Sequence, residues 1–275
     1  MNTPLQSLKR PKLSGLLLLS LLGWLSSACV ITVDQQEPVT PQRPRFSSNT
    51  RTTAGGTVEV EGGIAIDPGD QVSFPVRVKY GLEEGSETYL EWSPYQEVDV
   101  ADDTERGVGD VLIGYRKRFL EETQTEPAVA LQLEAKIPTA DSDEGLGTGE
   151  TDLFVAGAGE KTFDKLRLGG FYELGLLGQV GDGGLDVQHG FAVVGTQKLD
   201  SRIEAFGEAA FVWTPAREDE QLFTTLGVNY HLAPTLMLDA AVVVGLSPDA
   251  PDFALLVGIT QNFGRPDWPG RRPGQ

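Results

Sequence analysis

The sequence contains a single cysteine, only two histidines and, after residue 25, no apolar run long enough to form a membrane-spanning helix. One cysteine excludes an internal disulfide. Basic residues are also scarce, because 22 Lys and Arg stand against 40 Asp and Glu and give a net charge of −18. A surface this acidic repels phosphate backbones, so we predict no nucleic-acid partner.

Motifs that would indicate catalysis or metal binding are missing as well. The chain has no GxSxG or HExxH motif and no paired metal-ligand spacing. His189 has the outward parity of its expected strand and His231 the inward parity, and the expected strand order places no serine near His231. The acidic run 141–144 lacks the glycine and the spacing of a calcium loop. We therefore predict no enzymatic activity, no cofactor and no metal site.

The first residues have the features of an export signal. A basic segment precedes the apolar stretch 13–25, which is too short and wrongly flanked for a spanning helix. Residues 25–29, Leu-Ser-Ser-Ala-Cys, resemble a bacterial lipobox, with a serine where leucine is usual. We predict a signal peptide over 1–28 and lipidation of Cys29. Ordinary signal cleavage at the same point is the alternative.

Residues 29–56 are rich in proline, threonine, serine and glutamine and show no periodicity. This composition is typical of an extended linker. We predict that the lipidated cysteine continues into a flexible tether. The alternative is a periplasmic plug or a peptidoglycan-binding segment, but the segment is short and Phe46 is its only aromatic residue.

Short segments that alternate apolar and polar residues fill the chain from Thr57 to Phe263. In the segment 224–232 the even positions carry mostly leucine, valine and tyrosine, and the odd positions carry threonine, glycine, asparagine and histidine. This alternation is typical of a membrane barrel, whose outward side chains meet lipid while the inward ones line a lumen. The expected strands are 57–66, 71–82, 86–98, 107–119, 126–138, 149–163, 164–178, 185–199, 201–214, 221–232, 235–246 and 252–263.

The fold class that we predict is therefore all-β, a transmembrane antiparallel up-and-down β-barrel of about 12 strands, over 57–263. A polar tail, 264–275, follows it. An even number of strands puts the first and the last residue of the barrel on the same side of the membrane. We expect a bacterial outer membrane, with both residues on its periplasmic side. The tight connections at 163–164, 199–201 and 232–235 would then be periplasmic turns, and 99–106, 138–148, 178–184 and 215–220 would be outer loops. The segment 258–263 resembles the terminal signal read by barrel-assembly machinery, an expected partner beside outer-membrane lipid.

Charged residues recur on the inward parity of these strands. They are Arg77, Lys79, Glu91, Asp110, Arg116, Arg118, Glu134, Lys136, Arg167, Glu173, Glu204, Glu208 and Asp239. Such a set is too charged for the dry core of a soluble, lipidated, ligand-binding β-barrel, which is one alternative. In a wet pore, rings of charge set selectivity. The same charges could also pair across a narrow lumen and close it.

Two sequence motifs carry a family resemblance. The first is Gly107-Val-Gly-Asp-Val-Leu-Ile-Gly-Tyr-Arg116, and the second combines Lys-Ile-Pro-Thr-Ala-Asp at 136–141 with Gly-Leu-Gly-Thr-Gly-Glu-Thr-Asp at 145–152. Together they resemble the outer-membrane family named for MetA-pathway phenol degradation, although that family usually has glycine where Ala140 stands. The resemblance implies an outer-membrane β-barrel transporter for small, aromatic or hydrophobic molecules. We interpret the motif glycines themselves as folding and turn residues.

The function that we predict is a channel or transporter for small solutes. The alternative is a closed structural or interaction barrel that presents its acidic loops to partners.

Overall fold

The computed structural model describes residues 37–100, 103–181 and 183–266. The predicted signal peptide, Cys29 and the last part of the polar tail lie outside these residues. Within the described ranges, no helix is long and apolar enough to cross a membrane.

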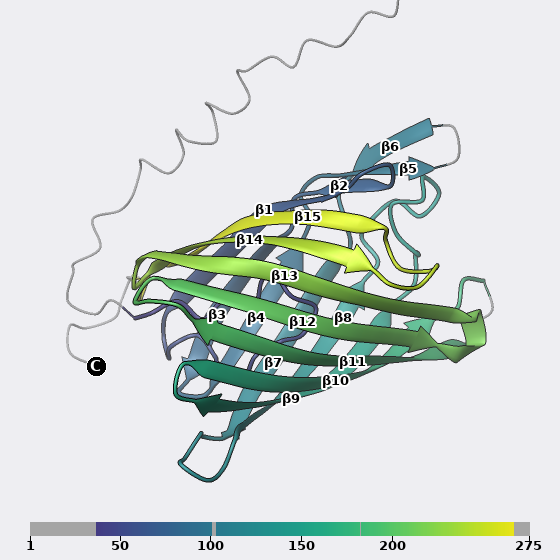
Figure 1. Cartoon of the computed structure of the whole chain (residues 1–275). Helices are drawn as coiled ribbons and strands as arrows, with labels where there is room; N and C mark the ends of the chain where they lie inside the picture. Colours follow the sequence, from purple (N-terminus) through teal and green to yellow (C-terminus); the bar gives the residue numbers. More distant parts are fainter. Residues whose placement is uncertain (1–36, 101–102, 182, 267–275) are drawn as a thin grey trace, which may run out of the picture. The chain divides into compact units, whose positions relative to one another are not determined.

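Twelve antiparallel strands close into one barrel (Figure 1). The first half of the wall begins with β1 (Val58–Asp67), β3 (Val76–Glu83), β4 (Ser86–Trp92) and β7 (Val111–Leu120). The wall continues with β8 (Ala128–Ile137), β9 (Asp152–Phe163), β10 (Leu166–Gly178), β11 (Leu185–Lys198), β12 (Ile203–Thr214), β13 (Asp219–Ala233), β14 (Leu236–Gly245) and β15 (Phe253–Asn262). Finally β15 pairs with β1, so the wall closes and leaves no open edge strand. The predicted fold class is confirmed.

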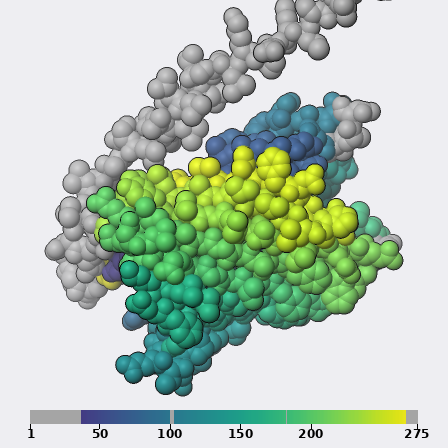
Figure 2. Space-filling model, viewed as in Figure 1, coloured from purple at the N-terminus to yellow at the C-terminus, as the bar shows by residue number. Residues whose placement is uncertain are grey.

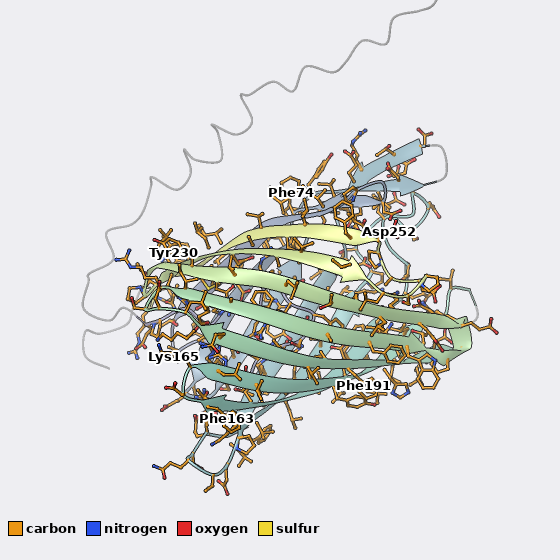
Figure 3. All side chains as sticks on the ribbon, viewed as in Figure 1. Phe74, Phe163, Lys165, Phe191, Tyr230 and Asp252 are labelled. Carbon is orange, nitrogen blue, oxygen red and sulfur yellow. The ribbon has the colours of Figure 1, made fainter. Side chains whose placement is uncertain are left out.

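The two ends of the barrel differ in their connections. At one end, which we call the turn end, two-residue turns join β3 to β4, β9 to β10 and β13 to β14. Longer segments join the strands at the opposite, loop end. Figure 3 labels Phe163, Lys165 and Tyr230 near the turn end and Asp252 near the loop end. The first strand, β1, begins at the turn end, and the last strand, β15, finishes there. The chain therefore enters and leaves the barrel on the same side, as the even strand count predicts.

A polar cap fixes the turn between β11 and β12. The backbone N–H groups of Arg202 and Ile203 donate to the carboxylate of Asp200, at 2.6 and 2.9 Å, and these two bonds lower the pKa of Asp200. The charged form of this side chain therefore holds the turn.

Proline interrupts two of the predicted strands. The predicted strand 71–82 divides at Pro75 into β2 (Gln71–Ser73) and β3, and the predicted strand 86–98 divides at Pro94 into β4 and β5 (Gln96–Val100). Proline has no N–H to contribute to a ladder, so the pairing changes partner at these points.

A small ribbon extends the barrel at its loop end. There β2 pairs with the far half of β1, β5 pairs with β2, and β6 (Asp103–Gly107) pairs with β5. The prediction of an outer loop at 99–106 is therefore wrong for most of that segment. Tyr95 and Arg106 both donate to the carboxylate of Glu97, which adds side-chain bonds to the hairpin.

The outer face of the wall is apolar. Figure 2 shows the side chains of the green and yellow strands as a closed surface. Exposed outward side chains include Ile113, Tyr115, Leu131, Leu133, Val155, Leu168, Tyr172, Val193, Leu226, Val228, Leu238, Val242, Leu255 and Val257. An apolar outside around a charged inside is the distribution expected for lipid contact, and it disfavours the soluble barrel.

Candidate functional site

The segment 37–56 lies inside the lumen, drawn in purple in Figure 1. It enters at the turn end, where the N–H of Val39 donates to the Pro234 carbonyl. Farther into the barrel, the ring of Phe46 packs edge-on against Phe171 and Phe223, with centroids 5.7 and 5.8 Å away. The chain then returns to the turn end, where Gly55 bridges to β3. We call residues 37–56 the luminal strap.

The prediction of a flexible tether is therefore wrong for residues 37–56, and the plug alternative describes them better. The strap has no regular secondary structure, so its backbone N–H groups need partners from elsewhere. The glutamates of the barrel wall provide them. Residues 29–36 lie outside the described part of the chain.

Seven backbone N–H groups of the strap donate to five wall glutamates over 2.6–3.1 Å. The pairs are Thr40 with Glu59, Gln42 and Arg43 with Glu61, Phe46 and Ser47 with Glu208, Thr50 with Glu160, and Thr53 with Glu87. These glutamates come from β1, β4, β9 and β12, so the strap is held from several sides of the lumen. Hydrogen bonds to a charged acceptor are about twice as strong as neutral ones.

Glycines on the inward face leave room for the strap. Gly63 of β1 is paired with Gly258 of β15, and the guanidinium group of Arg43 lies against both. A Cβ at Gly190 would come within 2.8 Å of the Phe46 ring. Larger residues at these positions would displace the strap, so the wall and the strap are complementary in shape as well as in charge.

A cluster of fully buried charges lies where the strap begins. Lys79 Nζ lies 2.6 Å from Glu59 and 2.7 Å from Glu61, and all three side chains have 0% exposure. Lys79 also donates to the carbonyl of Thr40, at 2.6 Å. One cation thus balances two carboxylates that also accept strap N–H groups, and this cluster joins β1, β3 and the strap.

A second buried group lies on β4, β7 and β8. Arg116 forms an ion pair of 2.9 Å with Glu87 and donates to Ser48 of the strap, at 3.0 Å. Next to it, the Tyr89 hydroxyl donates to Glu134 at 2.7 Å, and its ring occupies the space that a side chain at Gly114 would need. This explains the motif glycine in structural terms.

The structure brings some of the predicted inward charges together and gives others new partners. Arg77 pairs with Glu91 at 2.5 Å, Lys136 approaches Asp110 at 3.7 Å, and Arg167 approaches Glu204 at 3.6 Å. Other predicted charges have partners outside the predicted set. Lys79 pairs with Glu59, Arg116 with Glu87, and Arg118 with Glu121. Glu208 accepts the N–H of Phe46, and Asp239 lies 3.8 Å from Arg43. Among the described residues, Glu173 has no hydrogen bond or ion pair.

Sequence reasoning missed four inward glutamates, Glu59, Glu61, Glu87 and Glu160, and the three strap arginines, Arg43, Arg45 and Arg51. The alternation Val-Glu-Val-Glu at 58–61 was a usable signal, because it places two glutamates on one strand face. The strap arginines have no such signal, since an irregular segment carries no parity.

The two resemblance motifs contact each other at the loop end. The carboxylate of Asp110 accepts the N–H groups of Thr139 and Ala140, both at 2.9 Å, and the Thr139 hydroxyl donates to the Gly109 carbonyl. Beyond this contact, Leu146 is buried, and its carbonyl accepts a bond from Gln96 of β5. The loop 138–151 is therefore fastened to the ribbon side of the barrel.

Replacing Asp110 with alanine should release this loop while the barrel stays folded. The change removes two charge-assisted bonds, worth about 1.5–3 kcal/mol each at most. We expect a glutamyl-specific protease to cleave the loop 138–151 of Asp110→Ala faster in vesicles. Asp103→Ala, a change at an exposed hairpin carboxylate, is the control. Equal cleavage rates in the two variants would count against the anchoring role.

The two histidines occupy different environments. His189 faces outward, accepts or donates a 3.0 Å hydrogen bond with the Tyr172 hydroxyl, and stacks on Trp213. His231 faces inward at the turn end. Neither has a serine hydrogen-bond partner among the described residues, and no cluster of three or more potential metal ligands occurs within those ranges.

Cavities lie on either side of the strap. On the loop-end side, a cavity of about 300 Å³ is lined by strap residues 42–48, by Arg77 and Glu91, and by side chains of β13–β15. On the turn-end side, two cavities of about 380 and 540 Å³ both include Pro38 in their lining. The strap thus stands between one cavity on the loop-end side and two on the turn-end side.

The structure is similar to the crystal structure of the COG4313 outer membrane channel from Pseudomonas putida F1. The match has a TM-score of 0.63 and 14% sequence identity, and it covers 82% of this chain and 99% of that chain. The fold is that of an outer-membrane β-barrel. NanC porin and KdgM porin also match this barrel, each with a TM-score of 0.51, at 12% and 6% identity, over 74% of this chain and 98% of theirs.

These identities are low, so the likeness concerns the fold of the barrel. No protein-family model matches the sequence, and no curated protein does. The resemblance to the phenol-degradation family therefore stays a prediction.

Proposed function

We propose that the protein is an outer-membrane channel for small solutes whose lumen is restricted by the luminal strap. The observation that carries this proposal is the pairing of an apolar outer wall with a charged lumen, where cavities lie on both sides of the strap. The contacts identified between strap and wall are hydrogen bonds, ion pairs and ring packing, all of which are reversible.

The solute class that we propose includes aromatic or hydrophobic molecules, as the family resemblance implies. Support comes from the aromatic cluster of Phe46, Phe171 and Phe223 within the lumen. We also propose that the turn end faces the periplasm, because Cys29 would then attach to the inner leaflet of the outer membrane by its lipid. Outer-membrane lipid and barrel-assembly machinery are the proposed partners. We propose no catalytic activity.

The second candidate is a closed interaction barrel. The extensive pairing of inward charges favours it, because ion pairs such as Lys79 with Glu59 and Glu61 leave few free charges to line a pore. The two candidates differ in whether the membrane-inserted protein conducts ions.

Single-channel recording of the refolded protein in planar bilayers tests the proposed function. We expect small, discrete, ohmic steps in the presence of the strap. Glu173→Gln should lower the preference for cations, because Glu173 is an inward carboxylate of β10 that has no partner among the described residues. Glu144→Gln, which changes an exposed loop carboxylate, should leave the reversal potential unchanged. A heat-modifiable barrel that inserts but stays silent would instead support the closed interaction barrel.

A further inference from the structure

We propose that the cavity on the loop-end side of the strap is a binding site for a small organic carboxylate that carries an apolar group. This inference rests on the proposed channel function and specifies the chemical class of its solute. The cavity measures about 300 Å³ and is lined by the strap, by β3 and β4, and by β13–β15. Its size lies at the lower end of small-molecule sites.

The lining of this cavity carries an excess of positive charge. Three arginines, Arg43, Arg45 and Arg77, line it together with one acidic residue, Glu91. Arg77 Nε lies 2.5 Å from Glu91, so these two charges neutralise each other. Outside the lining, Asp239 lies 3.8 Å from Arg43, so Arg45 is the cation of the lining that forms no ion pair with a described residue.

Both strap arginines retain donor groups that could bind a ligand. Arg43 Nη2 bonds the Val257 carbonyl and lies 3.8 Å from Asp239, but its Nε is buried without a hydrogen-bond partner. The Arg45 guanidinium lies over the Phe206 ring, 5.7 Å from its centroid, and no described residue forms a hydrogen bond or ion pair with it. A buried donor without an acceptor is costly, so an oxyanion would be stabilised here.

Apolar side chains form another part of the lining, beside the polar residues Gln42, Ser48 and Thr225. Phe46 and Phe223 contact each other edge-on, with centroids 5.8 Å apart, and Val243 and Leu256 complete this side. A bare inorganic anion would leave the apolar surface uncovered, and a neutral arene would leave the guanidinium donors unpaired. A carboxylate with an apolar body satisfies both parts of the lining.

The test compares three probes of matched shape or charge. Benzoate carries both features, benzamide keeps the shape without the charge, and acetate keeps the charge without the ring. We expect saturation-transfer NMR on the refolded protein in detergent to show about tenfold tighter binding of benzoate than of benzamide, since one charge-assisted bond is worth about that factor. Acetate should bind more weakly than benzoate as well.

Variants of Arg45 locate the site. Arg45→Gln should weaken benzoate binding by about tenfold and leave benzamide binding unchanged. Arg45→Lys retains the charge and should preserve most of the affinity for benzoate. Arg106→Gln alters an exposed pair on the β5–β6 hairpin, and its benzoate affinity should match that of the unmodified protein. If Arg45→Gln does not refold, two other measurements decide whether the site exists. They are the ranking of the three probes on the unmodified protein and the benzoate affinity of Arg45→Lys.

Equal affinities for benzoate and benzamide would overturn the proposal, as would an Arg45→Gln variant with undiminished preference for benzoate. If the protein conducts ions in bilayers but does not prefer benzoate, the proposed binding site is rejected and the proposed channel function is retained. If the protein prefers benzoate but never conducts, the binding site is retained and the channel function is rejected.

Discussion

Lys79→Met is expected to lower the free energy of unfolding by about 3–5 kcal/mol, because it leaves two carboxylates buried without their cation. Glu59 and Glu61 have 0% side-chain exposure, and Lys79 Nζ lies within 2.7 Å of both. The loss also removes the bond from Lys79 to the strap carbonyl of Thr40. Urea unfolding of the refolded protein, followed by the heat-modifiable gel shift, measures the change.

The matched control is Lys117→Met, on the outer surface. Lys117 pairs with Glu83 at a similar distance, 2.6 Å, but the two side chains are 28% and 70% exposed. A pair exposed to this extent contributes at most about 1 kcal/mol. Adding Glu59→Gln and Glu61→Gln to Lys79→Met should restore most of the stability, because glutamine oxygens still accept the strap N–H groups. Equal losses from the two lysine changes would show that the Lys79 cluster has no special role.

Deleting residues 38–53 should raise the single-channel conductance several-fold. These residues occupy the lumen between the loop-end cavity and the two turn-end cavities, so their removal joins these cavities. The deletion also frees the glutamates that accept strap N–H groups, and it removes Arg43, Arg45 and Arg51. A pore lined by free carboxylates prefers cations, so the reversal potential should shift in that direction.

A milder change tests the same restriction without shortening the chain. Glu160→Ala combined with Glu208→Ala removes the acceptors of the Phe46, Ser47 and Thr50 N–H groups. We expect intermittent openings to the conductance of the deletion variant. Glu83→Ala combined with Glu121→Ala, at exposed sites near the turn end, should not produce such openings. An unchanged conductance in the deletion variant would mean that the strap does not limit the pore.

Alternation in the sequence was sufficient to predict the barrel, because strand parity follows directly from the lipid and lumen faces. The segments from β8 to β15 match their predicted ranges within a few residues. Larger differences occur at Pro75 and Pro94, where missing N–H groups break the ladder and permit the ribbon of β2, β5 and β6. The predicted strand 107–119 also begins later, as β7 at Val111. Residues 96–100 alternate polar and apolar side chains in the sequence, but their pairing with β2 and β6 depends on the break at Pro94.

The strap could not be predicted from the same evidence. Its proline-rich, polar composition is that of a linker, and its position depends on wall groups distant in sequence, such as Glu160 and Glu208. Parity placed Glu208 in the lumen but could not identify its partner as a backbone amide rather than a lysine or an arginine. Inward glycines such as Gly63 and Gly190 did not predict the strap either, because the strap fills the space beside them only in the folded protein.

The contact of Arg43 with Gly63 and Gly258 bears on how the barrel is assembled. These glycines belong to the first and the last strand of the wall, and Arg43 also donates to the Val257 carbonyl of the last strand. The strap continues directly into the first strand, so the ribosome makes it before any of the wall, whereas β15 is made after every other strand. We expect β15 to pair with β1 around a strap that is already in place. The part of the domain that is synthesised first would then be the last to be enclosed.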